Sequence, residues 1–207
     1  MRHLLKIHKN NFFRAKLRVG NNWIIPLADN LPGMGKSSFA TNYLLKWRQV
    51  CDSGLNDEFT EALSRSHKIH VALPIGALTD HYRFESNLLT IIQGELRNLL
   101  IPPYPHFLDR TFRTTGEFLS ILTSVAGPVF VVLDEIGQAF ECQGLNDFQI
   151  RDTFLHFVKH VVMTWLLNKD VLVLLVGRAR HSLIGQRGLF PIRQMPSLIS
   201  PCKSLSG

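Results

Sequence analysis

Cysteine is scarce in this chain of 207 residues, which has three, Cys51, Cys142 and Cys202. They are far apart in the sequence and fit no zinc-binding spacing, so neither a disulfide framework nor a zinc motif is indicated. We therefore expect a reducing compartment and predict an intracellular protein, either cytoplasmic or nuclear.

Long hydrophobic runs are also missing. The pair Leu4-Leu5 is too short to be the apolar core of a secretory signal. The most apolar stretch of sufficient length, residues 148–167, carries charged and histidine side chains that a membrane would exclude. We expect no membrane association. The composition, 45% hydrophobic and 19% charged, is that of a folded globular protein.

Acidic side chains are absent from residues 1–28, where lysine and arginine recur. One interpretation is a contact surface for nucleic acid or a protein partner, and a net charge of +7 favours phosphate-bearing partners. A targeting peptide and a solvated flank are the alternatives. We expect a basic flank at 1–20, one domain at 21–190, and a Pro- and Ser-containing tail at 191–207.

Hydrophobic periodicity predicts alternating strands and helices. Short apolar runs predict strands at residues 23–27, 69–75, 129–133 and 171–176. Helical spacing of apolar residues predicts helices at 37–50, 57–66, 84–100, 115–125 and 148–167. This alternation predicts an α/β three-layer sandwich with a mostly parallel sheet.

A glycine-rich segment lies between the first predicted strand and the first predicted helix, with the sequence Asn30-Leu31-Pro32-Gly33-Met34-Gly35-Lys36-Ser37. It matches the phosphate-binding loop, Gly-x-x-x-x-Gly-Lys-Ser/Thr, except that Asn30 replaces the first glycine. Asparagine accepts left-handed backbone angles, so the loop remains feasible. The alternative is a glycine-rich turn that precedes a helix by chance.

Each part of this segment has a predicted role in holding a nucleoside triphosphate and Mg²⁺. Backbone N–H groups from Asn30 to Ser38 would point at phosphate oxygens. Lys36 would neutralise the β and γ phosphates, and the Ser37 hydroxyl would bind magnesium.

Two acids, Asp134 and Glu135, follow directly on the apolar run at 129–133. Side chains at the carboxyl end of a parallel strand would lie beside the phosphate loop. We predict that Asp134 holds magnesium through water and that Glu135 activates the hydrolytic water as general base. The alternative is a pair of solvated acids at a strand end.

A third candidate group follows the last predicted strand, at Gly177-Arg178. ATPases with a glutamate next to the magnesium-binding aspartate place their fourth strand between the first and third. Arg178 would then face the γ phosphate as a catalytic sensor. Arg180 competes for this role, and a surface arginine is the alternative.

These motifs resemble those of known ATPases. The Pro32-Gly33 loop resembles the Gly-Pro-Pro-Gly-Thr-Gly-Lys-Thr loop of AAA-type ATPases, and Asp134-Glu135 resembles their Walker B pair. Residues 174–178 look like the fourth strand and arginine of the STAND group. Residues 31–45 are similar to the ATPase module of Crinkler and retrotransposon-hot-spot proteins of oomycetes and kinetoplastids. The Crinkler translocation motif, a fifth strand and a helical lid are not recognised.

The sequence thus predicts an ATP-binding domain that is a Mg²⁺-dependent ATPase or an ATP-driven switch. The resemblance implies that a homo-oligomer could complete the site with a neighbour's arginine. The alternative is a catalytically degenerate module that contacts nucleic acid or protein, and a small-molecule kinase ranks last. His156 and His160 lack the glutamate of zinc proteases, so we do not expect a metal there.

Overall fold

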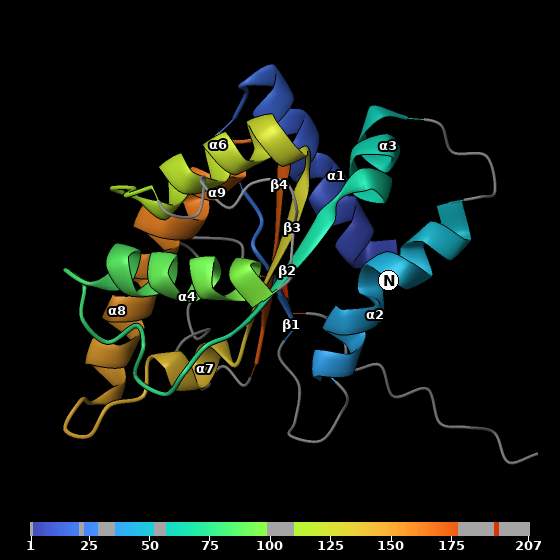
Figure 1. The fold of residues 1–207 in the computed structure, drawn as a ribbon. Coiled ribbons are helices and arrows are strands. Elements are labelled where there is room, and N and C mark those ends of the chain that lie inside the picture. Colours follow the sequence, from blue (N-terminus) through green and yellow to red (C-terminus); the bar gives the residue numbers. More distant parts are fainter. Residues whose placement is uncertain are drawn as a thin grey trace, which may run out of the picture.

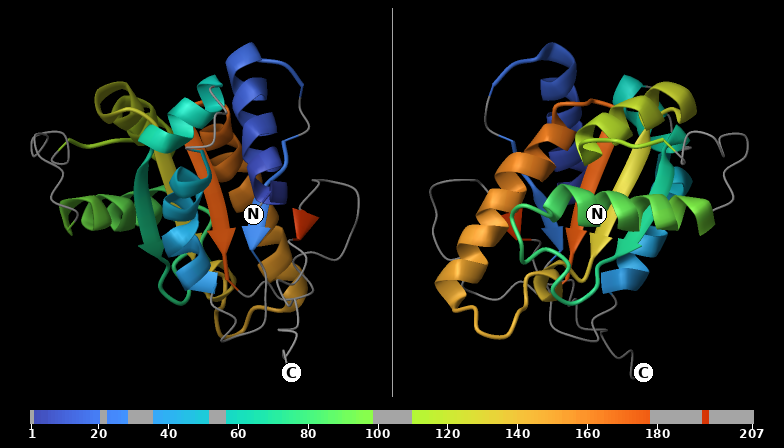
Figure 2. Two further views of the ribbon diagram at one scale, coloured as in Figure 1. Left: turned by 90° about the vertical axis from the view of Figure 1, so that its right-hand side faces the viewer. Right: turned by 60° about the vertical axis from the view of Figure 1, so that its left-hand side comes forward.

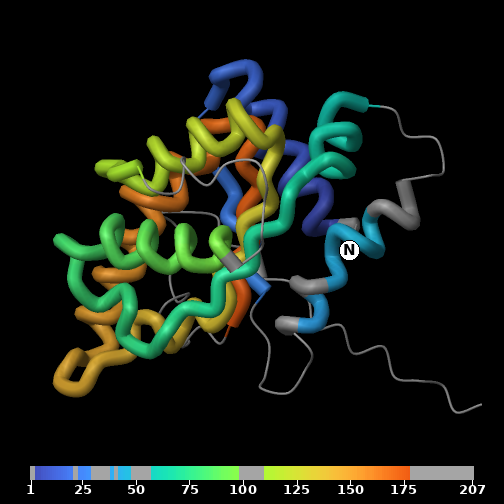
Figure 3. Tube along the Cα trace, viewed as in Figure 1, coloured from blue at the N-terminus to red at the C-terminus, as the bar shows by residue number. Residues whose placement is uncertain are grey.

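The computed structural model describes residues 2–20, 23–28, 36–51, 57–98, 110–177 and 193–194, and Figure 3 traces the path of the chain. Five strands form one sheet in the order β2-β3-β4-β1-β5, and every neighbouring pair is parallel. The strands are β1 (Pro26–Ala28), β2 (His67–Ala72), β3 (Val129–Asp134), β4 (Val171–Val176) and β5 (Arg193–Gln194). The predicted α/β fold with a parallel sheet is confirmed.

Helices connect the strands and cover both faces of the sheet (Figure 1). Those before β3 are α1 (Arg2–Leu17), α2 (Lys36–Cys51), α3 (Glu58–Arg65), α4 (Phe84–Asn98) and α6 (Thr115–Ala126). Those after it are α7 (Ile136–Ala139), α8 (Asp147–Phe157), the π-helical turn η1 (Val158–Val162) and α9 (Met163–Leu166). The predicted helix at 148–167 is therefore present as one unbroken helical segment, in which the middle turn is π-helical.

Three layers result because β3 and β4 are buried on both sides and alternate residues face opposite layers. Val131 and Val173 pack in the cluster formed with α4, α6, α8 and α9. Val132 and Leu174 pack in the cluster formed with α1, α2 and α3. The two panels of Figure 2 look onto these two helical layers in turn. Phe154, Phe157 and Trp165 are core residues, as predicted.

Capping side chains explain where two of the helices begin. The Thr114 side chain accepts a hydrogen bond from the Glu117 backbone N–H at the start of α6. Asn146 and Gln149 form a reciprocal capping box at the start of α8, so this helix begins at Asp147.

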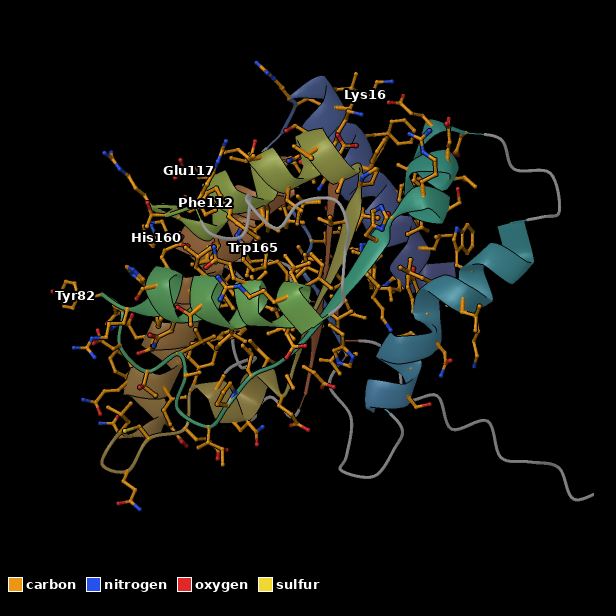
Figure 4. All side chains as sticks on the ribbon, in the orientation of Figure 1. Lys16, Tyr82, Phe112, Glu117, His160 and Trp165 are labelled. Carbon is orange, nitrogen blue, oxygen red and sulfur yellow. The ribbon has the colours of Figure 1, made fainter. Side chains whose placement is uncertain are left out.

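A buried chain of hydrogen bonds links three helices of one layer. Trp165, which Figure 4 labels, donates from Nε1 to the Thr115 hydroxyl at 2.8 Å. The Thr115 hydroxyl and backbone N–H donate in turn to the Glu85 carboxylate, at 2.6 and 2.7 Å. Because each buried polar group has a partner, this network fixes α9, α6 and α4 against one another.

The basic segment at 1–20 differs from the expected flank. It forms α1, which buries Leu4 and Phe12 in the cluster that includes side chains of β3 and β4. The buried Asn11 amide bonds to both backbone groups of Ile24, donating to the carbonyl at 2.7 Å and accepting from the N–H at 3.4 Å. The apolar residues among the lysines, and not the charge, decide where this helix lies.

The predicted tail also contains an element that the sequence did not indicate. Arg193 and Gln194 form β5, which pairs in parallel with Pro26 and Leu27 of β1. Two polar residues have no strand periodicity, so no pattern could have predicted this pairing.

His8 makes the packing of α1 dependent on pH. This residue is 1% exposed, and its ring packs against both Tyr43 and Phe130, which stack on each other. Its Nε2 has no hydrogen-bond partner among the described residues, and burial lowers its pKa to about 3. In the unfolded chain this histidine has a pKa near 6.5. Above that pH His8 does not lower the free energy of unfolding. Below that pH, the free energy of unfolding decreases by about 1.4 kcal/mol per pH unit, because the unfolded state binds a proton that the folded state does not.

We expect the urea concentration at the midpoint of unfolding to decrease when the pH is lowered from 7.5 to 5. The decrease should be smaller in His8→Leu. Leucine removes the proton-binding site and leaves an apolar side chain in the core. The exposed His67→Leu is the matched control, and it should follow the wild type. Equal pH dependence in His8→Leu and wild type would show that another group controls acid stability.

Candidate functional site

The predicted phosphate loop connects β1 to α2. Asn30, Leu31, Pro32, Gly33, Met34 and Gly35 lie outside the described residues, so their roles remain predictions. Lys36 and Ser37 are the first residues of α2, and Ser38 is exposed in its first turn. This turn contains no acidic residue, so no carboxylate competes with an anion for the positive end of the helix.

The Ser38 position is further fixed within α2. Asn42 donates from Nδ2 to the Ser38 backbone carbonyl at 2.8 Å and to its hydroxyl oxygen at 3.4 Å. These bonds connect the first and second turns of the helix.

The order of the strands brings Asp134 and the beginning of α2 to the same end of the sheet, where the parallel strands have their carboxyl ends. β4 lies between β1 and β3, as the sequence predicted for an ATPase of this type. The Gly177 N–H, just after β4, donates to the Ala28 carbonyl at the end of β1, at 3.2 Å. The carboxyl ends of β1, β4 and β3 are therefore neighbours, and α2 begins at this edge (Figure 1).

Asp134 is the last residue of β3 and is buried, with 4% of its surface exposed. Strand alternation points its side chain to the layer of α1, α2 and α3, as for Val132. One carboxyl oxygen accepts from the Glu135 backbone N–H at 2.9 Å, and the other lies 3.1 Å from His70 Nε2. A carboxyl group in this position can face a cation bound at the start of α2.

Glu135 lies at the start of α7 and is exposed, and its side chain makes no cap hydrogen bond. Its backbone is left-handed, with φ 60° and ψ 34°. This conformation costs a residue with a Cβ about 1 kcal/mol, and strain of this kind concentrates at functional sites. The turn points the chain away from the sheet immediately after Asp134.

Gly177 explains why this turn can approach β4. Its φ is +139°, and a Cβ placed on it would lie 2.7 Å from the Ile136 nitrogen and 3.1 Å from two backbone carbons of Glu135. Only glycine allows the two strand ends to approach this closely. Arg178, the predicted sensor, follows directly but lies outside the described residues.

Sequence reasoning missed His70 and the packing role of Gly177. His70 has no motif, but it lies on the polar face of a strand that alternates between buried and more exposed residues. Once β2 is known to neighbour β3, this alternation places His70 on the same face as Asp134.

The basic residues of α1, predicted to contact a partner, are partly engaged within the molecule. Lys9 pairs with Asp57, and Lys16 pairs with Glu58 at the start of α3. The hydrogen bond from Lys16 lowers the pKa of Glu58 below its ordinary value. Figure 4 labels Lys16 at the end of α1 that lies beside α3. These pairs connect α1 to α3, and contact with nucleic acid remains a prediction.

His156 and His160 do lie together, with ring centroids 4.1 Å apart, and His81 packs on His156 at 4.9 Å. Burial, together with the charges of His160 and His81, lowers the pKa of His156. Within the described ranges, no group of three or more His, Cys, Asp or Glu side chains is arranged to hold a metal ion.

A hollow of about 830 Å³ lies at the opposite edge of the sheet, where residues 168–170 lead into β4. Its three acids are engaged, since Glu85 accepts from Thr115, Glu117 accepts from the Arg113 backbone N–H, and Asp170 pairs with Lys169. No predicted site residue is among the side chains that line it. None of the helices in the described part of the chain has the length and hydropathy needed to cross a membrane.

Comparison with known proteins identifies no family. No protein-family model matches the chain, and no curated protein matches its sequence. Among solved structures, the chain is similar to the ORC2 protein of Aeropyrum pernix, solved as ADPNP–ADP complexes, with 14% identity and a TM-score of 0.43. The match covers 88% of this chain and 41% of that one, so the chain spans less than half of its neighbour's length. A likeness this weak assigns no activity.

Proposed function

We propose that this chain binds ATP with Mg²⁺ and is an ATPase or an ATP-driven switch. One observation carries the proposal: β4 lies between β1 and β3, which brings Asp134 to the edge of the sheet where α2 begins with Lys36-Ser37. The alternative, a glycine-rich turn that precedes a helix by chance, does not explain why the acidic pair lies beside the start of that helix. Ligands of open α/β sheets bind at this edge.

The residues present suit the predicted ligands. An acid-free first turn in α2 suits phosphate oxygens, and the Asp134 carboxyl group suits a hydrated magnesium ion. In the proposed site, Lys36 holds the β and γ phosphates and Ser37 contributes an oxygen ligand to the ion. Bound magnesium would supply charge neutralisation to the phosphates. Glu135, exposed beside Asp134, orients and deprotonates the attacking water.

The finer assignments rest on resemblance. The Pro32-Gly33 loop and the Asp134-Glu135 pair resemble those of AAA and STAND ATPases, which supports ATP as the nucleotide. Residues 31–45 resemble the Crinkler and retrotransposon-hot-spot module. By the same resemblance, Arg178 reports the γ phosphate, and a second copy of the chain completes the site.

A thermal-shift screen of nucleotides tests the proposal. A ligand that binds only the folded state stabilises it by about 2.7 kcal/mol at one hundred times its Kd. For a chain of this size, we expect ATP with Mg²⁺ to raise Tm by roughly 5–10 °C. ATP in EDTA should raise it less, and Mg²⁺ alone should not raise it. Equal curves with and without nucleotide would contradict nucleotide binding.

A second candidate is a module that binds nucleotide but does not hydrolyse it. Asn30 favours it, because this residue replaces the glycine that begins the usual phosphate loop. Phosphate release separates the two candidates. Turnover above the background of a Glu135→Gln preparation would exclude the inert module.

A further inference from the structure

His70 lies against Asp134 although no motif marks it. Strands β2 and β3 are parallel, with His70 opposite Val132 and Ala72 opposite Asp134. Residues two positions apart along a strand share a face, so His70 is the diagonal neighbour of Asp134. Ala72, directly opposite the acid, has only a methyl group, and the longer imidazole reaches past it. His70 Nε2 lies 3.1 Å from Asp134 Oδ2.

This contact completes a pair of donors, one for each carboxyl oxygen. The Glu135 backbone N–H donates to Oδ1, and the His70 ring, with its proton on Nε2, donates to Oδ2. Two donors on different oxygens fix the rotation of the carboxyl plane. An ionised carboxyl group has about four acceptor sites, so it can accept further hydrogen bonds besides these two.

Burial makes this support significant. The Asp134 side chain is 6% exposed and that of His70 is 27% exposed. A buried carboxyl group with few water contacts depends on protein donors for its orientation. The imidazole is the more exposed partner, so its replacement should alter the acid without opening the core.

We propose that His70 is a positioning residue that holds the Asp134 carboxyl group in the orientation needed to bind the water shell of Mg²⁺. This inference rests on the proposed function, in which Asp134 supports the ion. Partners that orient a metal-binding group in this way typically contribute about ten- to a hundredfold to metal affinity. His70 itself touches neither nucleotide nor ion in this proposal.

Two substitutions of nearly equal length separate positioning from packing. His70→Gln keeps an N–H donor near the place of Nε2, and His70→Met has a similar length without a donor. The matched control is His67→Met, which changes an exposed histidine at the other end of the same strand. The full chain is used, and ATP affinity is measured by calorimetry across a Mg²⁺ series and in EDTA.

We expect His70→Met to raise the Mg²⁺ concentration for half-maximal ATP binding about tenfold, while ATP affinity in EDTA stays within about twofold. His70→Gln should stay within about threefold of the wild type, and His67→Met should match the wild type. If His70→Met lacks a cooperative thermal transition, His70→Phe replaces it as a donor-free variant.

The outcomes distinguish this inference from the function on which it rests. Wild-type Mg²⁺ dependence in the donor-free variant would overturn the role of His70 and leave the proposed function intact. An equal loss in His70→Gln and His70→Met would also overturn it, because the donor would not matter. No Mg²⁺-dependent ATP binding by the wild type would overturn both proposals.

Discussion

Lys36→Ala is expected to abolish ATP binding while leaving the fold intact. Lys36 is the first residue of α2, where its charge would lie against the β and γ phosphates, which backbone N–H groups alone cannot neutralise. Alanine is a good helix former, so the helix should persist. Calorimetry with Mg²⁺-ATP should detect no binding at concentrations that saturate the wild type.

The matched control is Lys46→Ala, which removes an exposed lysine from the same helix. It should bind ATP with wild-type affinity, because only the beginning of α2 faces the proposed site. Glu135→Gln complements Lys36→Ala, because it should retain ATP binding and lose only phosphate release. Tight binding of ATP by Lys36→Ala would remove the phosphate loop from the proposal.

Gly177→Ala is the second substitution with a large expected effect. Its Cβ would lie 2.7 Å from the Ile136 backbone nitrogen, and φ is +139°. Neither backbone can yield easily, because one strand end and the Asp134–Glu135 turn are both fixed by neighbours. Steric overlap and backbone strain together should cost about 3 kcal/mol or more in the free energy of unfolding. Chemical denaturation measures this loss, and the relaxed turn should also weaken ATP binding.

Gly144→Ala separates backbone strain from steric overlap. Gly144 also has a positive φ, +89°, but a Cβ there meets nothing within 4 Å. We expect it to cost only about 1 kcal/mol, from backbone strain alone, and to leave ATP binding unchanged. If the two glycine variants lose equal stability, the close approach of Gly177 to Glu135 is not important.

Much of the fold follows from periodicity alone. The runs Val129–Leu133 and Val171–Val176 predict strands buried on both faces, and the structure has strands there. The strand order needed further reasoning, because it was inferred from the Asp134-Glu135 pair and from how such ATPases are built. The strand Arg193–Gln194 could not be predicted, because it has only two residues and no periodicity of its own. It is a strand only because it pairs with β1.

The sequence could predict only part of the candidate site, because some of its contacts form only when strands far apart in the sequence come together. Asp134 and Glu135 follow an apolar run, so adjacent sequence marks them. His70 is 64 positions away from Asp134 in the sequence, and its role exists only because β2 pairs with β3. Gly177 was recognised as a strand exit, but its contact with the Glu135 turn depends on how closely two strand ends approach.

The Asn11 amide substitutes for a missing strand. Ile24 lies just before β1, which pairs through Leu27 and Ala28 with β4 and through Pro26 and Leu27 with β5, so neither register includes Ile24. By pairing with both the N–H and the carbonyl of Ile24, Asn11 makes the two bonds that a neighbouring strand would make. The chain leading toward the predicted phosphate loop is thus braced by α1, so this helix supports the strand from which the proposed site begins.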